Sequence, residues 1–249
     1  MQYLIRIGMA RLNAKQQLQG LVGSVYIRNM NGMKVLQTRP VKPKQTKGTR
    51  ASAADFKYAV AQSQTIRKAF QSLLALGTHP YTSQRLTGEL HKGFHIPQGY
   101  TNHLTLFTAD LAHLIGFEFH KTCPLELLLP VIFPFEVSDD GSLCLAPTLV
   151  PAVHSKLLPD SKASCALVFV VASWHPDRGP QADTVVFSFE MKQHIPTPIA
   201  LQTDVYPAGT RLIVAAQLLV WNSRTALGDK NFCNNKQFNP VQVVFTGVV

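Results

Sequence analysis

The chain has 249 residues, 46% of them hydrophobic and 15% charged, which is typical of a folded protein with one large or two ordinary domains. The net charge of +10 is divided unevenly. Residues 1–92 carry +13, with Asp55 and Glu89 as their only acidic residues, and residues 93–249 carry −3. This asymmetry indicates an acidic partner of the N-terminal part (nucleic acid, an acidic protein face or an anionic surface), or else a merely soluble basic surface.

No targeting or membrane-spanning segment is predicted. The apolar stretch at the N-terminus contains Arg6 and Arg11, so it lacks the apolar core of about 7–15 residues that a signal peptide has. No other run reaches the roughly 18 apolar residues that cross a bilayer. We therefore expect cytoplasmic synthesis without a signal peptide, and no membrane insertion.

The cysteines are too far apart to suggest a metal site or a disulfide framework. They are Cys123, Cys144, Cys165 and Cys233, and no CxxC pair occurs among them. We expect buried thiols and no bound metal or cofactor.

The segment 20–40, GLVGSVYIRNMNGMKVLQTRP, predicts a β-hairpin. An extended pattern runs to Ile27 and resumes at Met33. Between them, Asn31-Gly32 supplies the positive φ angles that a tight primed turn requires. Residues 1–19 have no decisive pattern and are compatible with a strand or a short helix.

A basic connector follows the hairpin, because Pro40 and Pro43 remove backbone donors and the neighbouring like charges repel. Such an arm neutralises phosphates by releasing counterions, without reading base sequence. Aromatic side chains are sparse, with Tyr26 as a candidate stacking ring, and no base-reading fold is evident. The cations to which we assign partner or nucleic-acid binding are Arg28, Lys34, Arg39, Lys42, Lys44, Lys47 and Arg50.

Residues 52–76 contain no Gly or Pro and repeat apolar side chains at helical spacing, which predicts a helix. Ser52 with Asp55 resembles a capping pair, and Gly77 supplies the stop. Residues 79–99, rich in Pro, Gly, Thr and His, predict a loop that acts as a hinge.

Residues 102–115 favour a second helix, although their threonines would equally suit a strand. From Leu125 onward the chain reads as short β-like runs bounded by turn residues. The runs at 165–174 and 183–192 predict a hairpin with a long loop. Trp174 is a candidate core aromatic.

The predicted fold class is mainly β with one or two helices. Residues 143–249 contain five or six runs, the number and spacing of an Ig-like or fibronectin-type antiparallel β-sandwich. We therefore expect a basic N-terminal region at 1–99 with hairpin arm and helix, a connecting segment at 100–142, and the sandwich at 143–249.

Two motifs, GxVGSVYxRxxNGxKVLxxRP near the N-terminus and FVVASWxxxxxxxADTVVFSFE in the C-terminal half, resemble an uncharacterised family of bacterial proteins of about 200 residues. The matching positions are Gly20, Gly23, Arg28, Gly32, Arg39, Pro40, Trp174, Ala182 and Asp183. The resemblance implies a Gly-rich N-terminal segment before an Ig-like domain. It implies no activity, and residues 79–140 do not take part in it.

The common catalytic motifs do not occur in the sequence: there is no phosphate loop, dinucleotide fingerprint, HExxH or GxSxG. His91 and His95 have helical metal-ligand spacing, but Gly93 and Pro97 argue against a helix there, so we expect surface and loop histidines. The six histidines between His79 and His120 are otherwise unassigned. Asp139-Asp140-Gly141 predicts a turn, because no further acidic residues complete a calcium loop.

These observations favour a non-enzymatic structural protein that assembles with copies of itself or with other subunits, such as a component of a phage-like particle, tail or filament. An extended arm and an Ig-like body both offer strand edges for pairing. The alternative is a nucleic-acid-associated module that uses the basic arm. A third reading is an enzyme whose residues meet only in the fold.

Overall fold

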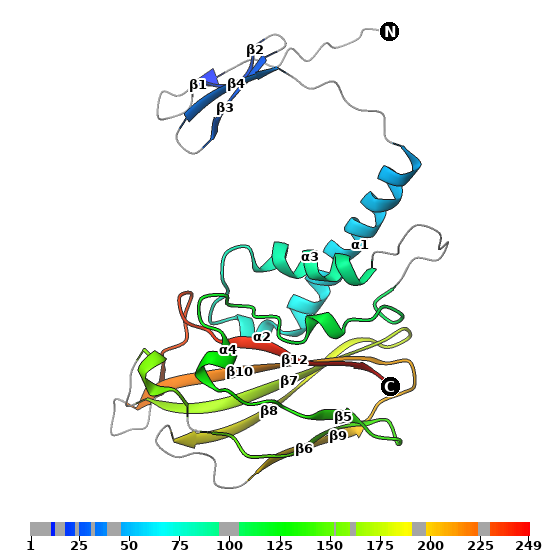
Figure 1. Cartoon of the computed structure of the whole chain (residues 1–249), viewed down its shortest axis with the longest axis vertical. Coiled ribbons are helices and arrows are strands. Elements are labelled where there is room, and N and C mark those ends of the chain that lie inside the picture. Colours follow the sequence, from blue (N-terminus) through cyan, green and yellow to red (C-terminus); the bar gives the residue numbers. More distant parts are fainter. Residues whose placement is uncertain are drawn as a thin grey trace. The chain divides into compact units, whose positions relative to one another are not determined.

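The structure is a computed structural model. It describes residues 11–12, 18–22, 25–30, 33–38, 46–94, 105–151, 153–159, 163–190, 198–223 and 230–249. The chain divides into two compact units, Met1–Thr49 and Arg50–Val249. The described part is mainly β, with antiparallel sheets and a few helices (Figure 1).

The first unit contains a four-stranded antiparallel sheet in the order β1-β2-β3-β4. Its strands are β1 (Arg11–Leu12), β2 (Leu18–Val22), β3 (Val25–Met30) and β4 (Met33–Thr38). The predicted hairpin is confirmed, because β3 pairs with β4 up to Met30 opposite Met33. The two turn residues, Asn31 and Gly32, lie outside the described residues.

Helix α1 (Lys47–Ala69) and the short α2 (Gln71–Leu74) occupy most of the predicted helix at 52–76. The helix begins earlier than expected because the Oγ1 atom of Thr46, not Ser52, accepts the backbone N–H of Thr49 at 3.1 Å. It is interrupted at Phe70, whose backbone leaves the helical region.

The loop predicted at 79–99 is wrong over most of its length, since Thr82–Phe94 form helix α3. Leu86, Leu90 and Phe94 recur every fourth residue and are buried, which outweighs the poor helix propensity of glycine. Gly93, which argued against a helix, is needed there. A Cβ at this position would lie 2.7 Å from the Cε1 atom of His113.

The helix favoured at 102–115 does not form over the described residues 105–115. One turn starts at Thr105 and ends at Ala109, and a 3-10 helix, η1 (Ala112–Leu114), follows. The guanidinium of the buried Arg211 donates to the carbonyl oxygens of Leu106 and Ala109, at 2.8 and 2.5 Å. Those carbonyls are therefore satisfied outside a helix.

A five-stranded antiparallel sheet forms the centre of the second unit, in the order β11-β10-β7-β8 with β12 also paired to β10. Its strands are β7 (Ser164–His175), β8 (Gly179–Glu190), β10 (Arg211–Ser223), β11 (Lys230–Phe232) and β12 (Val241–Val248). The predicted β7–β8 hairpin is present, but its loop is short. Pairing continues to His175 opposite Gly179, because Arg178 N–H closes a turn on the carbonyl of His175.

A three-stranded antiparallel sheet lies against one face of this larger sheet, in the order β5-β6-β9 (Figure 1). Its strands are β5 (Phe135–Val137), β6 (Ser142–Thr148) and β9 (Ile199–Val205). The β-like run that began at Leu125 starts instead with a short helix, α4 (Leu125–Leu128), and η2 (Ser155–Leu157) follows β6.

Alternate residues of the central strands enter two separate cores. In β7, Leu167 and Phe169 pack toward the three-stranded sheet, whereas Val168 and Val170 pack toward helices α1 and α3. The segment predicted as a connector at 100–142 contributes to both cores, for example through Phe119 on the helical side and Phe135 on the other. Both faces of the central sheet are thus covered, and the second unit has three layers.

A buried amide network fixes the end of α2 to the central sheet. The side chain of Asn239 is fully buried, and its Oδ1 atom accepts from Gln217 Nε2 at 2.6 Å and Asn234 Nδ2 at 3.0 Å. Its Nδ2 atom donates to the carbonyls of Leu73 at 3.0 Å and Gly77 at 2.7 Å. The Asn239 side chain therefore links the helical layer to Gln217 on β10 and to Asn234, which follows β11.

We predict that Asn239→Ala destabilises the second unit strongly. The change removes four hydrogen bonds, each worth roughly 0.5–1.5 kcal/mol, and leaves the Gly77 carbonyl without a partner among the described residues. The amides of Gln217 and Asn234 keep one acceptor each, the carbonyls of Leu73 and Leu218. The free energy of unfolding in urea should fall by about 3 kcal/mol or more. Asn235→Ala, at an exposed position four residues away, is the matched control. Equal stability of the two variants would contradict the network's role.

Candidate functional site

The structure describes four of the seven cations to which binding was assigned. Arg28 on β3 is paired with Val35, and Lys34 on β4 is paired with Asn29, in adjacent rungs of the hairpin. Lys47 begins helix α1, and Arg50 lies in the same helix with its side chain exposed. The remaining three, Arg39, Lys42 and Lys44, lie outside the described residues.

Helix α1 carries a basic stripe that extends beyond the predicted set. Arg50, Lys57 and Lys68 are all exposed and are separated by seven and eleven residues, about two and three helical turns. They therefore share one face of the helix, away from the buried Ala59 and Ile66. None of the three forms an ion pair with another described residue.

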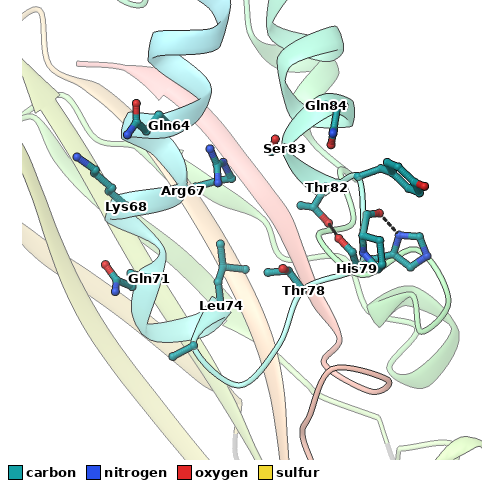
Figure 2. A pocket seen from close by; sticks show the side chains of 13 residues that line it. Gln64, Arg67, Lys68, Gln71, Leu74, Thr78, His79, Thr82, Ser83 and Gln84 are labelled. Carbon is teal, nitrogen blue, oxygen red and sulfur yellow. Dashed lines mark hydrogen bonds between the residues drawn. The ribbon is translucent and has the colours of Figure 1, made fainter. Parts of the chain in front are cut away.

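The stripe ends at a cavity of about 600 Å³ between the end of α1 and the start of α3 (Figure 2). The lining contains Arg67, Lys68 and His79 but no Asp or Glu. The other polar groups are neutral and include Gln64, Gln71, Thr78, Ser83 and Gln84. The cavity is therefore polar and electropositive.

Arg67 is the least satisfied cation of this cavity. In Figure 2 its side chain extends from α1 toward the start of α3. Its Nε atom is buried and has no hydrogen-bond partner among the described residues. A buried guanidinium donor without an acceptor is unfavourable, and Arg67 as a whole is half-buried and lines the cavity.

The first turn of α3 faces the same space. The N–H groups of Thr82 and Arg85 bond to the carbonyls of His79 and Tyr81. Those of Ser83 and Gln84 have no acceptor among the described residues, as expected for the first turn of a helix. Tyr81, at the rim, is 71% exposed and has a φ of 72°, rare for a side chain of this size.

A second cavity, of about 390 Å³, lies on the other side of α3 and contains charges of both signs. Its lining includes Arg85, His113, Glu118 and Lys121. The Nη1 atom of Arg85 and the Oε2 atom of Glu118 are both buried without described partners. Convergent polar groups of this kind are what the enzymatic reading requires.

Glu118 is the most perturbed acid of the described chain. Burial removes its carboxyl from water and raises the pKa from 4.5 to about 8, although the N–H groups of Leu125 and Glu126 lower it. The Oε1 atom accepts the N–H of Leu125 at 2.9 Å. Glu118 is therefore largely protonated at neutral pH.

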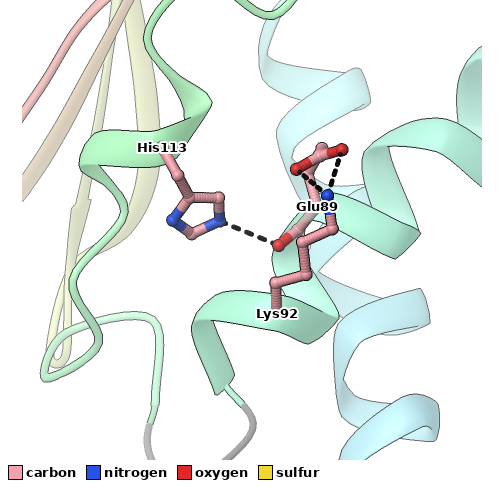
Figure 3. A network of polar contacts seen from close by, with 3 residues as sticks. All are labelled: Glu89, Lys92 and His113. Carbon is pink, nitrogen blue, oxygen red and sulfur yellow. Dashed lines mark hydrogen bonds and ion pairs between the residues drawn. The ribbon is translucent and has the colours of Figure 1, made fainter.

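The polar contacts at the rim of this cavity are already satisfied (Figure 3). The Nε2 atom of His113 donates to the carbonyl oxygen of Glu89 at 2.8 Å. The carboxylate of Glu89 pairs with Lys92 at 2.9 Å. These contacts hold η1 against α3, so His113 acts here as a structural link.

His120 is buried and lies beside Cys123, which is half-buried. His120 is 2% exposed, and its Nε2 atom donates to the carbonyl of Lys236 at 3.0 Å. The Sγ atom of Cys123 lies 3.0 Å from the Nδ1 atom of His120. Burial raises the pKa of the Cys123 thiol, which disfavours the thiolate that nucleophilic chemistry needs.

The other histidines are scattered. His79 contacts the ring of His120, His91 contacts Phe56, and His95 and His103 lie outside the described residues. Within the described ranges, no three His, Cys, Asp or Glu side chains are arranged to hold a metal ion. Asp139-Asp140-Gly141 forms the predicted turn, with Gly141 at a φ of 87°.

Comparison of the chain with protein-family models, with curated proteins and with solved structures finds no match in any of the three. None of the helices in the described part is long and apolar enough to cross a membrane.

Sequence reasoning missed the residues that make both cavities. Arg67 and Lys68 were visible as part of the best predicted helix, but their significance depends on α3, which was interpreted as a loop. The repeat of Leu86, Leu90 and Phe94 was the signal that could have identified this helix. No local pattern marks Glu118 or Arg85, because the burial of both depends on distant segments.

We predict that Glu118 makes stability depend on pH. Between pH 4.5 and 8 the folded protein holds a proton that the unfolded chain has lost, so the free energy of unfolding falls as the pH rises through this window. The total loss is on the order of 5 kcal/mol, since the pKa rises from 4.5 to about 8 and each pKa unit corresponds to about 1.4 kcal/mol. Glu118→Gln should abolish this fall and be the more stable protein at pH 9 in urea titrations.

The control for this experiment is Glu136→Gln, which removes an exposed carboxylate from β5. It should keep the pH dependence of the unchanged protein. A Glu118→Gln protein that still loses stability between pH 5 and pH 9 would show that another group titrates.

Proposed function

We propose that this protein is a non-enzymatic structural protein whose copies assemble through the basic N-terminal sheet. The observation that carries the proposal is that none of the described side chains of β3 and β4 is buried. Met33 and Leu36 are 68% and 70% exposed, and their odd separation places them at positions on opposite faces of the sheet. A small sheet is marginally stable in water by itself, so the exposure of these described side chains favours a second surface that covers them.

Strand β4 is the element through which this sheet would join a partner. It lies at the edge of the four-stranded order and pairs only with β3 among the described strands. An edge strand presents unpaired N–H and C=O groups that can template another strand. Exposed apolar side chains on both faces of this edge add a hydrophobic contribution to such pairing.

The partner that the charges favour is a second copy of the chain. Residues 1–54 contain ten Lys or Arg and no Asp or Glu. The three-stranded sheet of the second unit is the opposite: β5, β6 and β9 contain no Lys or Arg. Its strands and the β5–β6 turn expose Glu136, Asp139, Asp140 and Asp204.

Edge pairing and charge complementarity therefore support a contact between the N-terminal sheet of one copy and β9 of the next. Strand β9 pairs only with β6 in the described part of the chain, which leaves one of its edges for addition. Because the two surfaces differ, the contact is heterologous and yields rings or open filaments. This mode of assembly suits a component of a phage-like particle, tail or filament.

The same proposal assigns the second unit to the Ig-like class. The support is that its two antiparallel sheets share one hydrophobic cluster, with Phe135 and Leu145 from one sheet and Phe169 and Leu212 from the other. The helical layer on the opposite face is an addition to that architecture.

We predict that deleting residues 1–40 abolishes higher-order species while the second unit keeps its cooperative thermal transition. Multi-angle light scattering should give an assembled mass for the intact protein at high concentration and a monomer mass for the truncated one. The proposal is contradicted if the intact protein stays monomeric or if the truncated protein keeps its assembled mass. Either result would indicate that the N-terminal sheet belongs to the core of its own chain.

Two charge reversals in the full-length chain test whether the acidic three-stranded sheet is the surface that the N-terminal sheet of the next copy contacts. Glu136→Lys with Asp204→Lys should reduce assembly as strongly as the deletion does. Asp177→Lys is the matched control, because Asp177 is exposed on the β7–β8 turn, outside the three-stranded sheet.

Nucleic-acid binding is a second candidate function, favoured by the stripe of Arg50, Lys57 and Lys68 on α1, which forms no ion pair with another described residue. Its cations lie on one exposed face and would neutralise phosphates without reading bases. The arm residues that precede α1 continue this positive charge along the sequence.

We predict that replacing Lys42, Lys44, Lys47 and Arg50 by Gln weakens retention on a polynucleotide column and reduces its salt dependence. Each lost phosphate contact lowers the slope of log affinity against log salt by about 0.9. The control replaces Lys121, Lys156, Lys236 and Arg178, which are exposed cations elsewhere in the second unit. Unchanged retention of the arm variant, or an equal loss in the control, would leave the basic charge without a binding role.

A further inference from the structure

We infer that the cavity between α1 and α3 binds the phosphate group of a phosphate ester. This inference is independent of the proposed assembly, because it concerns a site within a single second unit. Its starting point is the Nε atom of Arg67, which is buried at the cavity without a described acceptor. Arg67 as a whole is half-buried and lines the cavity, and a phosphate oxygen is the acceptor that matches its guanidinium best.

The charge around Arg67 selects an anion. Lys68 adds a second cation to the lining, and His79 a ring that can donate a hydrogen bond. The lining contains no carboxylate, and neither Arg67 nor Lys68 forms an ion pair with another described residue. The positive charge of the cavity is therefore not neutralised by the described chain.

The start of α3 supplies backbone donors to the same space. The N–H groups of Ser83 and Gln84, both lining residues, have no acceptor among the described residues. Helix α3 has 13 residues, so its aligned peptide dipoles favour negative charge at this end. Arg67 from α1 and Ser83 and Gln84 from the first turn of α3 thus line one cavity (Figure 2).

The volume of the cavity and the neutral polar residues of its lining favour a ligand larger than inorganic phosphate. A cavity of about 600 Å³ accommodates a group of nucleotide size. Gln64, Gln71 and Gln84 offer amides to a sugar or base, and the exposed ring of Tyr81 offers a stacking surface at the rim. The phosphate ester can belong to a free nucleotide or to a single-stranded nucleic acid.

The test is calorimetric titration of the full-length protein with inorganic phosphate, with adenosine monophosphate and with a single-stranded oligothymidylate. The proposal expects Arg67→Gln to weaken binding of all three probes at least tenfold. Lys156→Gln removes the same charge from an exposed position outside the cavity lining and is the matched control. It should leave binding of inorganic phosphate and the nucleotide unchanged.

The oligonucleotide distinguishes the two sources of phosphate. Tighter binding of oligothymidylate than of the nucleotide, with a further loss in Lys57→Gln, identifies a nucleic-acid backbone that continues along the α1 stripe. Equal or weaker binding of oligothymidylate identifies a free nucleotide. Both results support a phosphate site in the cavity, provided that Arg67→Gln weakens binding at least tenfold.

A second measurement keeps the inference falsifiable if Arg67→Gln does not fold. Phosphate titrated into the unchanged, nitrogen-labelled protein should shift the amide signals of Ser83 and Gln84 and the Nε signal of Arg67. The inference is overturned if no probe binds, if the shifts occur only elsewhere, or if Arg67→Gln and Lys156→Gln lose binding equally. Light scattering on the same samples reports assembly separately, so failure of one proposal leaves the other testable.

Discussion

The structure depends on the burial of the β7–β10 strand pair on both faces. These two strands pair along eleven residues, from Arg211 opposite Trp174 to Trp221 opposite Ser164. Neither face can be left in water, since each buried Val, Leu or Phe contributes roughly 1.5–3 kcal/mol. The three-stranded sheet must cover one face, and helices α1 and α3 must cover the other. The helices and the three-stranded sheet thus contribute equally to the core of the second unit.

This double burial explains which parts of the fold the sequence could predict. A strand buried on both faces is a continuous apolar run, and residues 165–174 and 212–221 were recognisable as strands for that reason. The β3–β4 hairpin was predictable because Asn31-Gly32 specifies a turn locally. Helix α1 was predictable from its period, although its start depended on the hydroxyl of Thr46.

The missed elements are those that depend on distant residues. Helix α3 contains two glycines, and its stability comes from packing Leu86 and Leu90 against the sheet. The segment after Thr105 loses its helix to the guanidinium of Arg211, more than 100 residues away in the sequence. The basic arm could be predicted from charge alone, but the cavity could not. Arg67 and the start of α3 meet only because the turn between them brings two helices together.

The segregation of charge follows from the same constraint. A body with two apolar cores has little room for ionised groups, so Glu118 retains its proton and Arg211 is held by carbonyls. The remaining charges lie on surfaces, and these surfaces differ in sign: the three-stranded sheet exposes acids, and α1 exposes bases. A phosphate and the acidic sheet of a second copy are both partners for positive charge. The cavity discriminates between them, because a phosphate group can enter the space that Arg67, Lys68 and the first turn of α3 line, whereas carboxylates on the surface of a sheet cannot.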